Sequence, residues 1–183
     1  MRKQPLNRNI FRSTFFILLL SFITQTSAFA GSTTLDALFL NLKNSANEAE
    51  ARDIEKKIWD SWMVSGDVDI DVLLQDALRK RRGYDFDGSI KVLNEIIDIK
   101  PDYSEAWNQR ATVYFLQGKY EESLIDIAKT LELEPRHFGS LAGRAVIRMR
   151  QSKPALAQQN IIEALKVHPY LRERRMFPNL KKT

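Results

Sequence analysis

The residues that could carry out acid–base or metal chemistry are few in this chain. It has two histidines, His137 and His168, and no cysteine. Each histidine stands within two residues of a proline, which is typical of a turn. Two such histidines do not supply a Ser–His–Asp triad or a multi-histidine zinc site. The lack of cysteine excludes disulfides, thiol catalysis and Cys-ligated metal.

Three aspartates, Asp67, Asp69 and Asp71, resemble the beginning of a calcium-binding loop. The other ligands of such a loop are missing, because no glycine follows at its sixth position and Leu78 stands at its twelfth. A helix cap is the better interpretation of Asp69 or Asp71. The chain also has no phosphate-binding glycine loop and no Gly-x-Ser-x-Gly elbow. We therefore predict a protein that is not an enzyme and that binds no metal or cofactor.

The first 30 residues have the pattern of an export signal. Four basic residues precede an uncharged apolar stretch at residues 15–23, and Ala28-Phe29-Ala30 is a cleavage pattern. As a helix the apolar stretch would span about 14 Å, which is shorter than the roughly 30 Å hydrocarbon core of a bilayer. We predict a signal peptide at residues 1–30, cleaved after Ala30, and an exported, periplasmic protein. An uncleaved segment that anchors the protein in the inner membrane is the alternative.

The net charge of +5 comes mostly from this leader, because residues 31–183 carry 24 basic and 23 acidic side chains. So balanced a chain is not expected to bind nucleic acid. The charge is nevertheless distributed unevenly, with a net −6 over residues 31–78 and a net +9 over residues 136–183. This asymmetry predicts either self-association or peripheral contact of the basic end with an anionic surface.

The most informative pattern is a repeat. Pro101, Pro135 and Pro169 stand 34 residues apart and close similar segments. This period is typical of stacked helix–turn–helix units. Alignment on the prolines brings small residues to the eighth and twentieth places of each unit, as two closely crossing helices require. These residues are Ala77, Ala111 and Ala145 at the eighth place, and Ser89, Ser123 and Ala157 at the twentieth.

The three units resemble tetratricopeptide repeats (TPRs), over about residues 70–171. The middle unit matches the family pattern best, at Trp107, Ala111, Tyr114, Gly118, Tyr120 and Pro135. The first unit departs from the pattern at its inter-helix turn, where Gly83 stands one place early and Phe86 replaces the usual Tyr. The third unit departs further, because Arg148 replaces the Tyr of its first helix and its turn lacks the glycine.

The resemblance implies an all-α fold, a right-handed α-solenoid of stacked antiparallel helix hairpins. We expect three TPR units at residues 70–103, 104–137 and 138–171. An N-terminal helical hairpin at residues 31–69 precedes them, and a basic C-terminal tail at residues 172–183 follows.

The N-terminal hairpin is expected to cap the solenoid, and a degenerate fourth repeat hairpin is the alternative. Trp59 and Trp62 are spaced three apart on one helix, and we expect them to pack onto the first repeat, with an aromatic ligand shelf as the alternative. This region also resembles exported, uncharacterised repeat proteins of alphaproteobacteria, which implies a compartment and no activity. The tail is expected to be a loosely ordered, solvated end. Folding of Met176, Phe177 and Leu180 back over the last repeat is the alternative.

Family resemblance further implies that a segment of another protein lies in a groove lined by the first helices. The candidate contact residues stand beside the core stripe of each first helix. They are Leu74, Leu78, Arg81, Arg82, Asn108, Thr112, Phe115, Leu116, Val146, Met149 and Arg150. The arginines are expected to bind an acidic segment, and Phe115 and Met149 to contact apolar side chains. Ordinary solvated helix surface is the alternative for each arginine.

One member of the family holds the C-terminal carboxylate of cytosolic chaperones with Lys, Asn and Arg side chains, and this clamp is absent here. The corresponding positions hold Leu74, Leu78, Gln109, Gly139 and Gly143. We therefore predict a non-enzymatic protein–protein interaction module, an adaptor or assembly factor of the cell envelope. The alternative is a structural envelope component that self-associates or contacts anionic surfaces through its basic C-terminal part.

Overall fold

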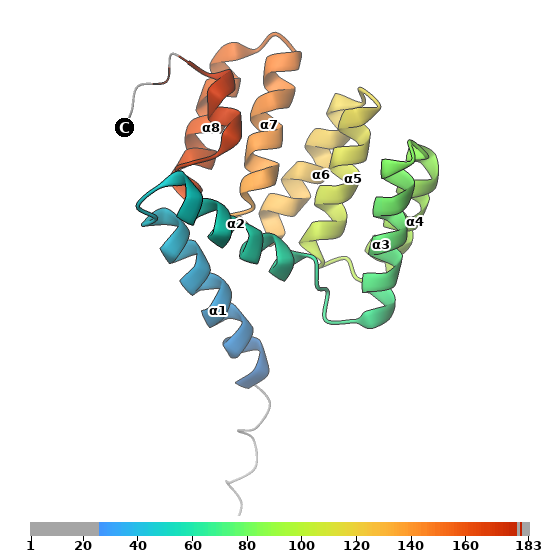
Figure 1. The fold of residues 1–183 in the computed structure, drawn as a ribbon. Coiled ribbons are helices and arrows are strands. Elements are labelled where there is room, and N and C mark those ends of the chain that lie inside the picture. Colours follow the sequence, from blue (N-terminus) through green and yellow to red (C-terminus); the bar gives the residue numbers. More distant parts are fainter. Residues whose placement is uncertain (1–25, 179, 181–183) are drawn as a thin grey trace, which may run out of the picture.

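The computed structural model of the chain describes residues 26–178 and residue 180, with side chains from residue 34 onward. This part of the chain forms eight α-helices and one short 3₁₀-helix and contains no strand (Figure 1). The predicted signal peptide lies almost wholly outside the described residues, because only the helical backbone of residues 26–30 is included. Export and cleavage after Ala30 therefore stay predictions.

Six of the helices form three antiparallel hairpins that lie side by side in chain order (Figure 1). The arrangement confirms the predicted all-α solenoid of helical hairpins. The hairpins are α3 (Val68–Arg82) with α4 (Phe86–Ile99), α5 (Ser104–Leu116) with α6 (Tyr120–Leu133), and α7 (Phe138–Arg150) with α8 (Pro154–Val167).

Small residues bring the two helices of each hairpin together. In the first two repeats a buried serine hydroxyl of the second helix donates a hydrogen bond to a carbonyl oxygen of the first. Ser89 donates to Ala77 over 2.9 Å, and Ser123 donates to Ala111 over 2.7 Å. The third repeat has Ala157 at this place, which is fully buried and makes only the apolar contact. The repeated small residues therefore mark the point where the paired helices cross most closely.

The inter-helix turns explain how the first and third repeats depart from the family pattern. Gly118 of the middle repeat has a φ of +74°, in the left-handed region that favours glycine. The equivalent residues, Tyr84 and Ser152, have φ values of 62° and 57°. The turn geometry is thus kept although the glycine is not, at the cost of a conformation that side chains rarely adopt.

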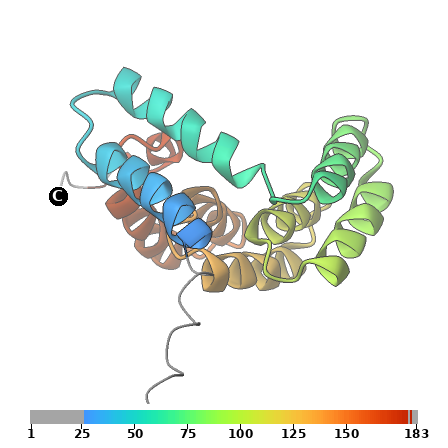
Figure 2. The same ribbon diagram turned by 90° about the horizontal axis from the view of Figure 1, so that it is seen from below.

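The N-terminal hairpin consists of α1 (Thr26–Lys43) and α2 (Glu48–Trp62). It does not stack on the neighbouring first repeat as a further hairpin, and only the end of α2 contacts that repeat, at Tyr103. Instead, α1 lies against α8, and α2 runs back across the ends of the repeats (Figure 2). Trp59 and Trp62 contact Phe138 of the third repeat, with ring centroids 5.4 and 5.0 Å apart. The predicted packing of both tryptophans onto the first repeat is therefore wrong.

The hydrophobic core explains this placement. Phe39, Ile58 and Trp62 of the N-terminal hairpin share one buried cluster with Phe138 and the small-residue face of the third repeat. The first repeat has its own separate cluster, built around α3 and α4. Because residues 63–67 form a linker between α2 and α3, the hairpin is free to pack where its aromatic face is best covered.

The C-terminal tail also packs on the third repeat. It forms a short 3₁₀-helix, η1 (Arg172–Met176), after which Phe177 is buried and Leu180 packs against the same cluster as the N-terminal hairpin. Met176 remains about half exposed. The described part of the tail thus folds back, as the alternative interpretation predicts for Phe177 and Leu180, and is not a loosely ordered end.

Candidate partner-binding groove

A groove lies between α5 and α7, and η1 forms its far wall. It encloses a cavity of about 320 Å³. Four of the predicted contact residues line it together, namely Asn108, Thr112, Phe115 and Val146. The other lining residues are Ala111, Ser123, Ile127, Gly139, Ser140, Gly143, Ile147, Glu173 and Met176. The groove is therefore mostly apolar, with a few polar groups near its edges.

Two glycines of α7 open the floor of this groove. At the corresponding places of α5 stand Glu105 and Gln109, whose side chains are long. A Cβ atom at Gly143 would lie 3.6 Å from Cδ1 of Ile127, which is an ordinary contact. At Gly139, in contrast, a Cβ atom would lie only 2.7 Å from the ring of Trp59. Gly143 thus leaves space for a ligand, whereas Gly139 leaves space for α2.

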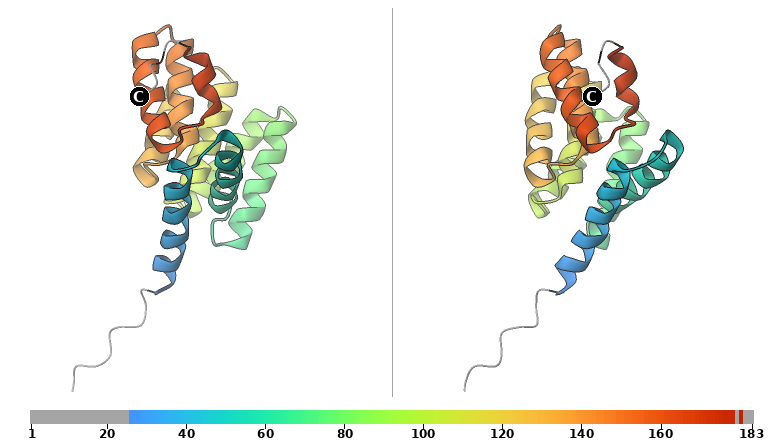
Figure 3. Two further views of the ribbon diagram at one scale, coloured as in Figure 1. Left: turned by 60° about the vertical axis from the view of Figure 1, so that its left-hand side comes forward. Right: turned by 90° about the vertical axis from the view of Figure 1, so that its left-hand side faces the viewer.

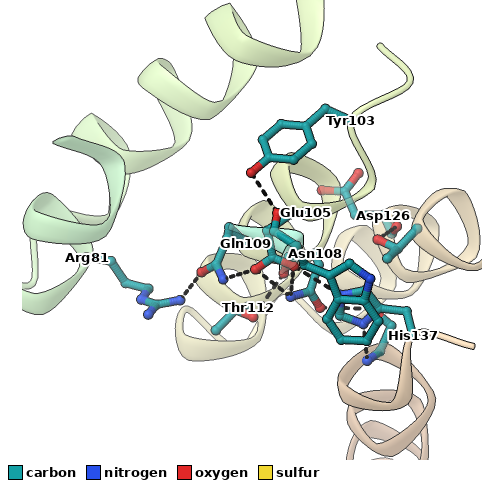
Figure 4. Close-up of polar contacts among 11 residues, drawn as sticks. Arg81, Tyr103, Glu105, Asn108, Gln109, Thr112, Asp126 and His137 are labelled. Carbon is teal, nitrogen blue, oxygen red and sulfur yellow. Dashed lines mark hydrogen bonds and ion pairs between the residues drawn. The ribbon is translucent and has the colours of Figure 1, made fainter. Parts of the chain in front are cut away.

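The polar end of the groove is organised by Glu105, which is completely buried (Figure 4). Its carboxylate accepts hydrogen bonds from the side-chain amides of Asn108 and Gln109, and it lies 3.0 Å from Nε2 of His137. The oxygen of Gln109 accepts a hydrogen bond from Arg81 of α3. Burial lowers the pKa of Arg81, and the nearby Glu105 charge opposes this effect. The network therefore joins all three repeats.

The hydrogen bonds of His137 indicate which ring nitrogen carries its proton. Nδ1 accepts a hydrogen bond from the backbone N–H of Ser140 over 3.1 Å, at the beginning of α7. Nε2 is then the protonated nitrogen, and it donates to Glu105. The hydroxyl of Ser140 donates to Asn108 over 2.8 Å. Thus no buried polar group of this cluster relies on solvent, and His137 acts as a helix cap.

One helix, α2, crosses the N-terminal ends of α5 and α7, and we refer to it as the strap. Its Trp62 ring stacks on His137, with centroids 4.0 Å apart and an interplanar angle of 11°. The carbonyl oxygen of Trp62 accepts a hydrogen bond from the hydroxyl of Tyr103 over 2.8 Å. Burial raises the pKa of Tyr103, so this hydroxyl stays a donor.

The other end of the strap contacts the turn that follows the third repeat. Oε2 of Glu55 lies 3.3 Å from Nε2 of His168, and this close contact lowers the pKa of Glu55. The strap therefore touches the turn after every repeat, through Tyr103, His137 and His168. Seen edge-on, the strap and η1 lie on the same side of α5–α8 (Figure 3, right). The groove between α5 and α7 lies beside them, and η1 contributes Glu173 and Met176 to its lining.

Comparison with known proteins agrees with this architecture. A family model described as tetratricopeptide repeat matches residues 104–137. A TPR repeat-containing protein of Rhizobium etli is 33% identical over 181 residues, a match that covers 87% of each chain. This chain belongs to the TPR repeat family.

Solved structures show the same fold at low sequence identity. The first TPR of Spaghetti, bound to an HSP90 peptide, is 18% identical with a TM-score of 0.56, covering 59% of this chain and 86% of that one. The crystal structure of MamA is 14% identical with a TM-score of 0.52, covering 83% of this chain and 85% of that one. The similarity therefore extends over the strap region as well as the repeats in the second case.

The remaining candidate contact residues of this TPR protein lie away from the groove between α5 and α7. Leu74 and Leu78 are buried in the core of the first repeat, so they present no surface to a partner. Arg81 is engaged with Gln109. Arg82 and Leu116 are exposed, but neither lines the cavity.

The third repeat divides its candidates between two sites. Met149 lines a smaller recess with Phe177 and Leu180 of the tail. Arg150 is exposed on the last turn of α7. The structure thus brings together Asn108, Thr112 and Phe115 of α5 with Val146 of α7, and leaves Leu116 and the candidates of α3 outside.

Sequence reasoning missed four residues of the site, Glu105, His137, Gly139 and Gly143. The two glycines stand four apart on the face of α7 that lines the groove, where the middle repeat has Glu105 and Gln109. That contrast between aligned repeats was a usable signal. No such signal existed for Glu105 and His137, because their burial depends on the strap.

No three His, Asp or Glu side chains within the described part of the chain converge on a point where they could hold a metal ion. Among the described helices, none combines the length and apolar character needed to cross a membrane.

Proposed function

We propose that this protein is a non-catalytic adaptor or assembly factor that binds a segment of a partner protein in the groove between α5 and α7. The observation that carries the proposal is the cavity of about 320 Å³ over Gly143, with Phe115, Val146 and Ile147 on its walls. A cavity of this size and lining suits one large apolar side chain of a partner. The fold is one in which a related structure holds an HSP90 peptide.

The proposal also includes the form of the bound segment. Because the strap covers the N-terminal ends of α5 and α7, and Met176 closes the far side, the groove takes an extended segment in preference to a helix. Acidic residues of the partner are expected beyond the cavity, toward Arg82 and Arg150. Both are exposed on the last turns of α3 and α7, where they are free to pair with carboxylates.

Site-specific crosslinking in intact cells tests this proposal. A photoreactive amino acid at Thr112, which lines the groove, is expected to capture a protein that the same group at Glu122 does not capture. Glu122 is the matched control because it is exposed on α6. Equal capture from both positions, or none from either, would contradict groove binding.

A blocking variant then tests the cavity itself. Gly143→Leu places a side chain in the groove, and we expect it to abolish the Thr112 crosslink while the fold is retained. Val72→Leu is the control, because Val72 is exposed on α3, outside the groove. Phe115→Ala should weaken the crosslink by removing an apolar wall. Removal of residues 172–183 is not a clean control, since Phe177 is part of the core.

The location is a further part of the proposal: we place the protein in the periplasm, after cleavage following Ala30. Such cleavage would remove the first five residues of α1 and leave Leu35, Phe39 and Leu42, which pack on the third repeat. Mass spectrometry of the mature N-terminus and cell fractionation test this. A mature chain that begins at Met1 and stays with the inner membrane would support the anchored alternative.

A further inference from the structure

A second recess lies at the opposite side of the third repeat from the groove's α5 wall, where α1, α8 and the tail meet. Its volume is about 290 Å³. Three cationic side chains from three different elements surround it, namely Lys43 of α1, Lys166 of α8 and Arg174 of η1. The rest of the lining is Ile162, Leu165, Pro169 and Leu180, so no carboxylate belongs to it.

The three cations are not part of the ion-pair network of the described residues. Three other arginines, Arg136, Arg144 and Arg175, pair with carboxylates. In contrast, Lys43, Lys166 and Arg174 have no side-chain hydrogen bond or ion pair within residues 34–178 and 180. A lysine in the last turn of a helix complements the helix dipole, which accounts for Lys43 or Lys166 taken alone. It does not account for three cations around one apolar recess.

An anion with an attached apolar part is complementary to this recess. The surroundings favour a lipid as the source of that anion. Leu40, which is 61% exposed, precedes Lys43 by three residues and so lies on the same face of α1. An adjoining recess shares Pro169 and Arg174 and adds Arg172, together with Arg175 and its ion-pair partner Glu48. Basic side chains beside exposed apolar ones are typical of a surface that contacts an anionic membrane.

We propose that the recess formed by Lys43, Lys166 and Arg174 binds the headgroup of an anionic phospholipid and thereby holds the protein at a membrane surface. Its wall of Ile162, Leu165 and Leu180 contacts the first methylene groups of the lipid. This site is separate from the partner groove, so both can be occupied at once.

Co-sedimentation with lipid vesicles tests this proposal on the chain from Gly31 to Thr183. We expect binding to phosphatidylcholine vesicles that contain phosphatidylglycerol and none to pure phosphatidylcholine. The triple variant Lys43→Gln, Lys166→Gln, Arg174→Gln should lose roughly a hundredfold in affinity, as expected for three basic residues near an anionic surface. Binding should weaken with salt.

A matched triple variant separates the recess from overall charge. Lys57→Gln, Lys91→Gln and Lys119→Gln remove the same charge from exposed positions on α2, on α4 and before α6. We expect the vesicle affinity of this control variant to stay within about twofold of that of the parent protein. An equal loss in both triple variants, equal binding to neutral vesicles, or no vesicle binding at low salt would overturn the proposal.

Two further measurements complete the test. Inorganic phosphate should displace the protein no better than chloride at the same ionic strength, and selective displacement by phosphate would instead indicate a site for a small free anion and overturn the lipid proposal. Gly143→Leu should bind vesicles normally. Because that variant blocks only the partner groove, failure of lipid binding and failure of the proposed function are distinguishable.

Discussion

The two ends of the solenoid differ in how they are closed. The outer face of α3 is open, and Val68 and Val72 on it are 77% and 63% exposed. The residues equivalent to Val72 in the next two repeats, Ala106 and Ser140, are at most 1% exposed because the preceding repeat covers them. At the other end α8 is covered, by α1 and by η1. The N-terminal hairpin and the described part of the C-terminal tail therefore both pack on the third repeat.

This difference shows that a capping hairpin need not cover the repeat that follows it in sequence. The strap connects the turns after all three repeats, through Tyr103, His137 and His168. It thus works against bending of the solenoid, whose repeats otherwise contact only their neighbours. The first repeat keeps an open face as a consequence.

The largest change in the free energy of unfolding is expected when the same substitution is made at equivalent positions of the covered and the open repeats. Ala106→Asp puts a carboxylate without a partner between α4 and α5, and we expect it to lower the free energy of unfolding by about 3–5 kcal/mol. Val72→Asp places the same carboxylate in solvent and should change it by less than about 0.5 kcal/mol. Urea denaturation followed by circular dichroism measures both. Similar losses in the two variants would mean that the α3 face is covered in solution.

Removal of the Trp62 ring from the strap is expected to cause the next largest loss in the free energy of unfolding. Trp62→Ala deletes a ring that contacts Phe39, His137 and Phe138. We expect a loss of about 3–5 kcal/mol, the range for a buried aromatic side chain. The same measurement on Val68→Ala, at the open end, should show almost no change. A loss below about 1 kcal/mol in Trp62→Ala would mean that the strap contributes little to closing the solenoid.

The sequence predicted the parts of this molecule that depend on local spacing. The three prolines gave the hairpins, and helical periodicity placed Asn108, Thr112 and Phe115 on the groove side of α5. The docking of the strap was not predictable in this way. An aromatic pair at helical spacing shows that Trp59 and Trp62 have a buried face, but it does not show which distant surface covers that face.

The two glycines of α7 allow a covered and an open position to be compared within one helix. Gly139→Ala forces a methyl group against the Trp59 ring, and we expect a loss of about 1–3 kcal/mol from overpacking. Gly143→Ala meets only an ordinary contact and should be neutral or stabilising by up to about 1 kcal/mol, because alanine favours the helix. Thermal unfolding midpoints measure both. A stabilised Gly139→Ala would contradict close packing of the strap on α7.

The smallest expected effect is a pH dependence of stability at the contact between Glu55 of the strap and His168. The contact with His168 lowers the pKa of Glu55 from its ordinary value of 4.5. A carboxyl group with a lowered pKa in the folded state stabilises the fold at pH values above 4.5, and this contribution is lost as the pH falls through the lowered pKa.

Glu55→Gln should therefore be less stable than the parent at pH 6, and the difference should disappear in acid. We expect a small difference, because Glu55 is partly solvated. Asp60→Asn is the control, because it removes a carboxylate from the exposed side of the strap. A difference between parent and Glu55→Gln that persists unchanged to pH 3 would mean that the Glu55–His168 contact does not hold the strap.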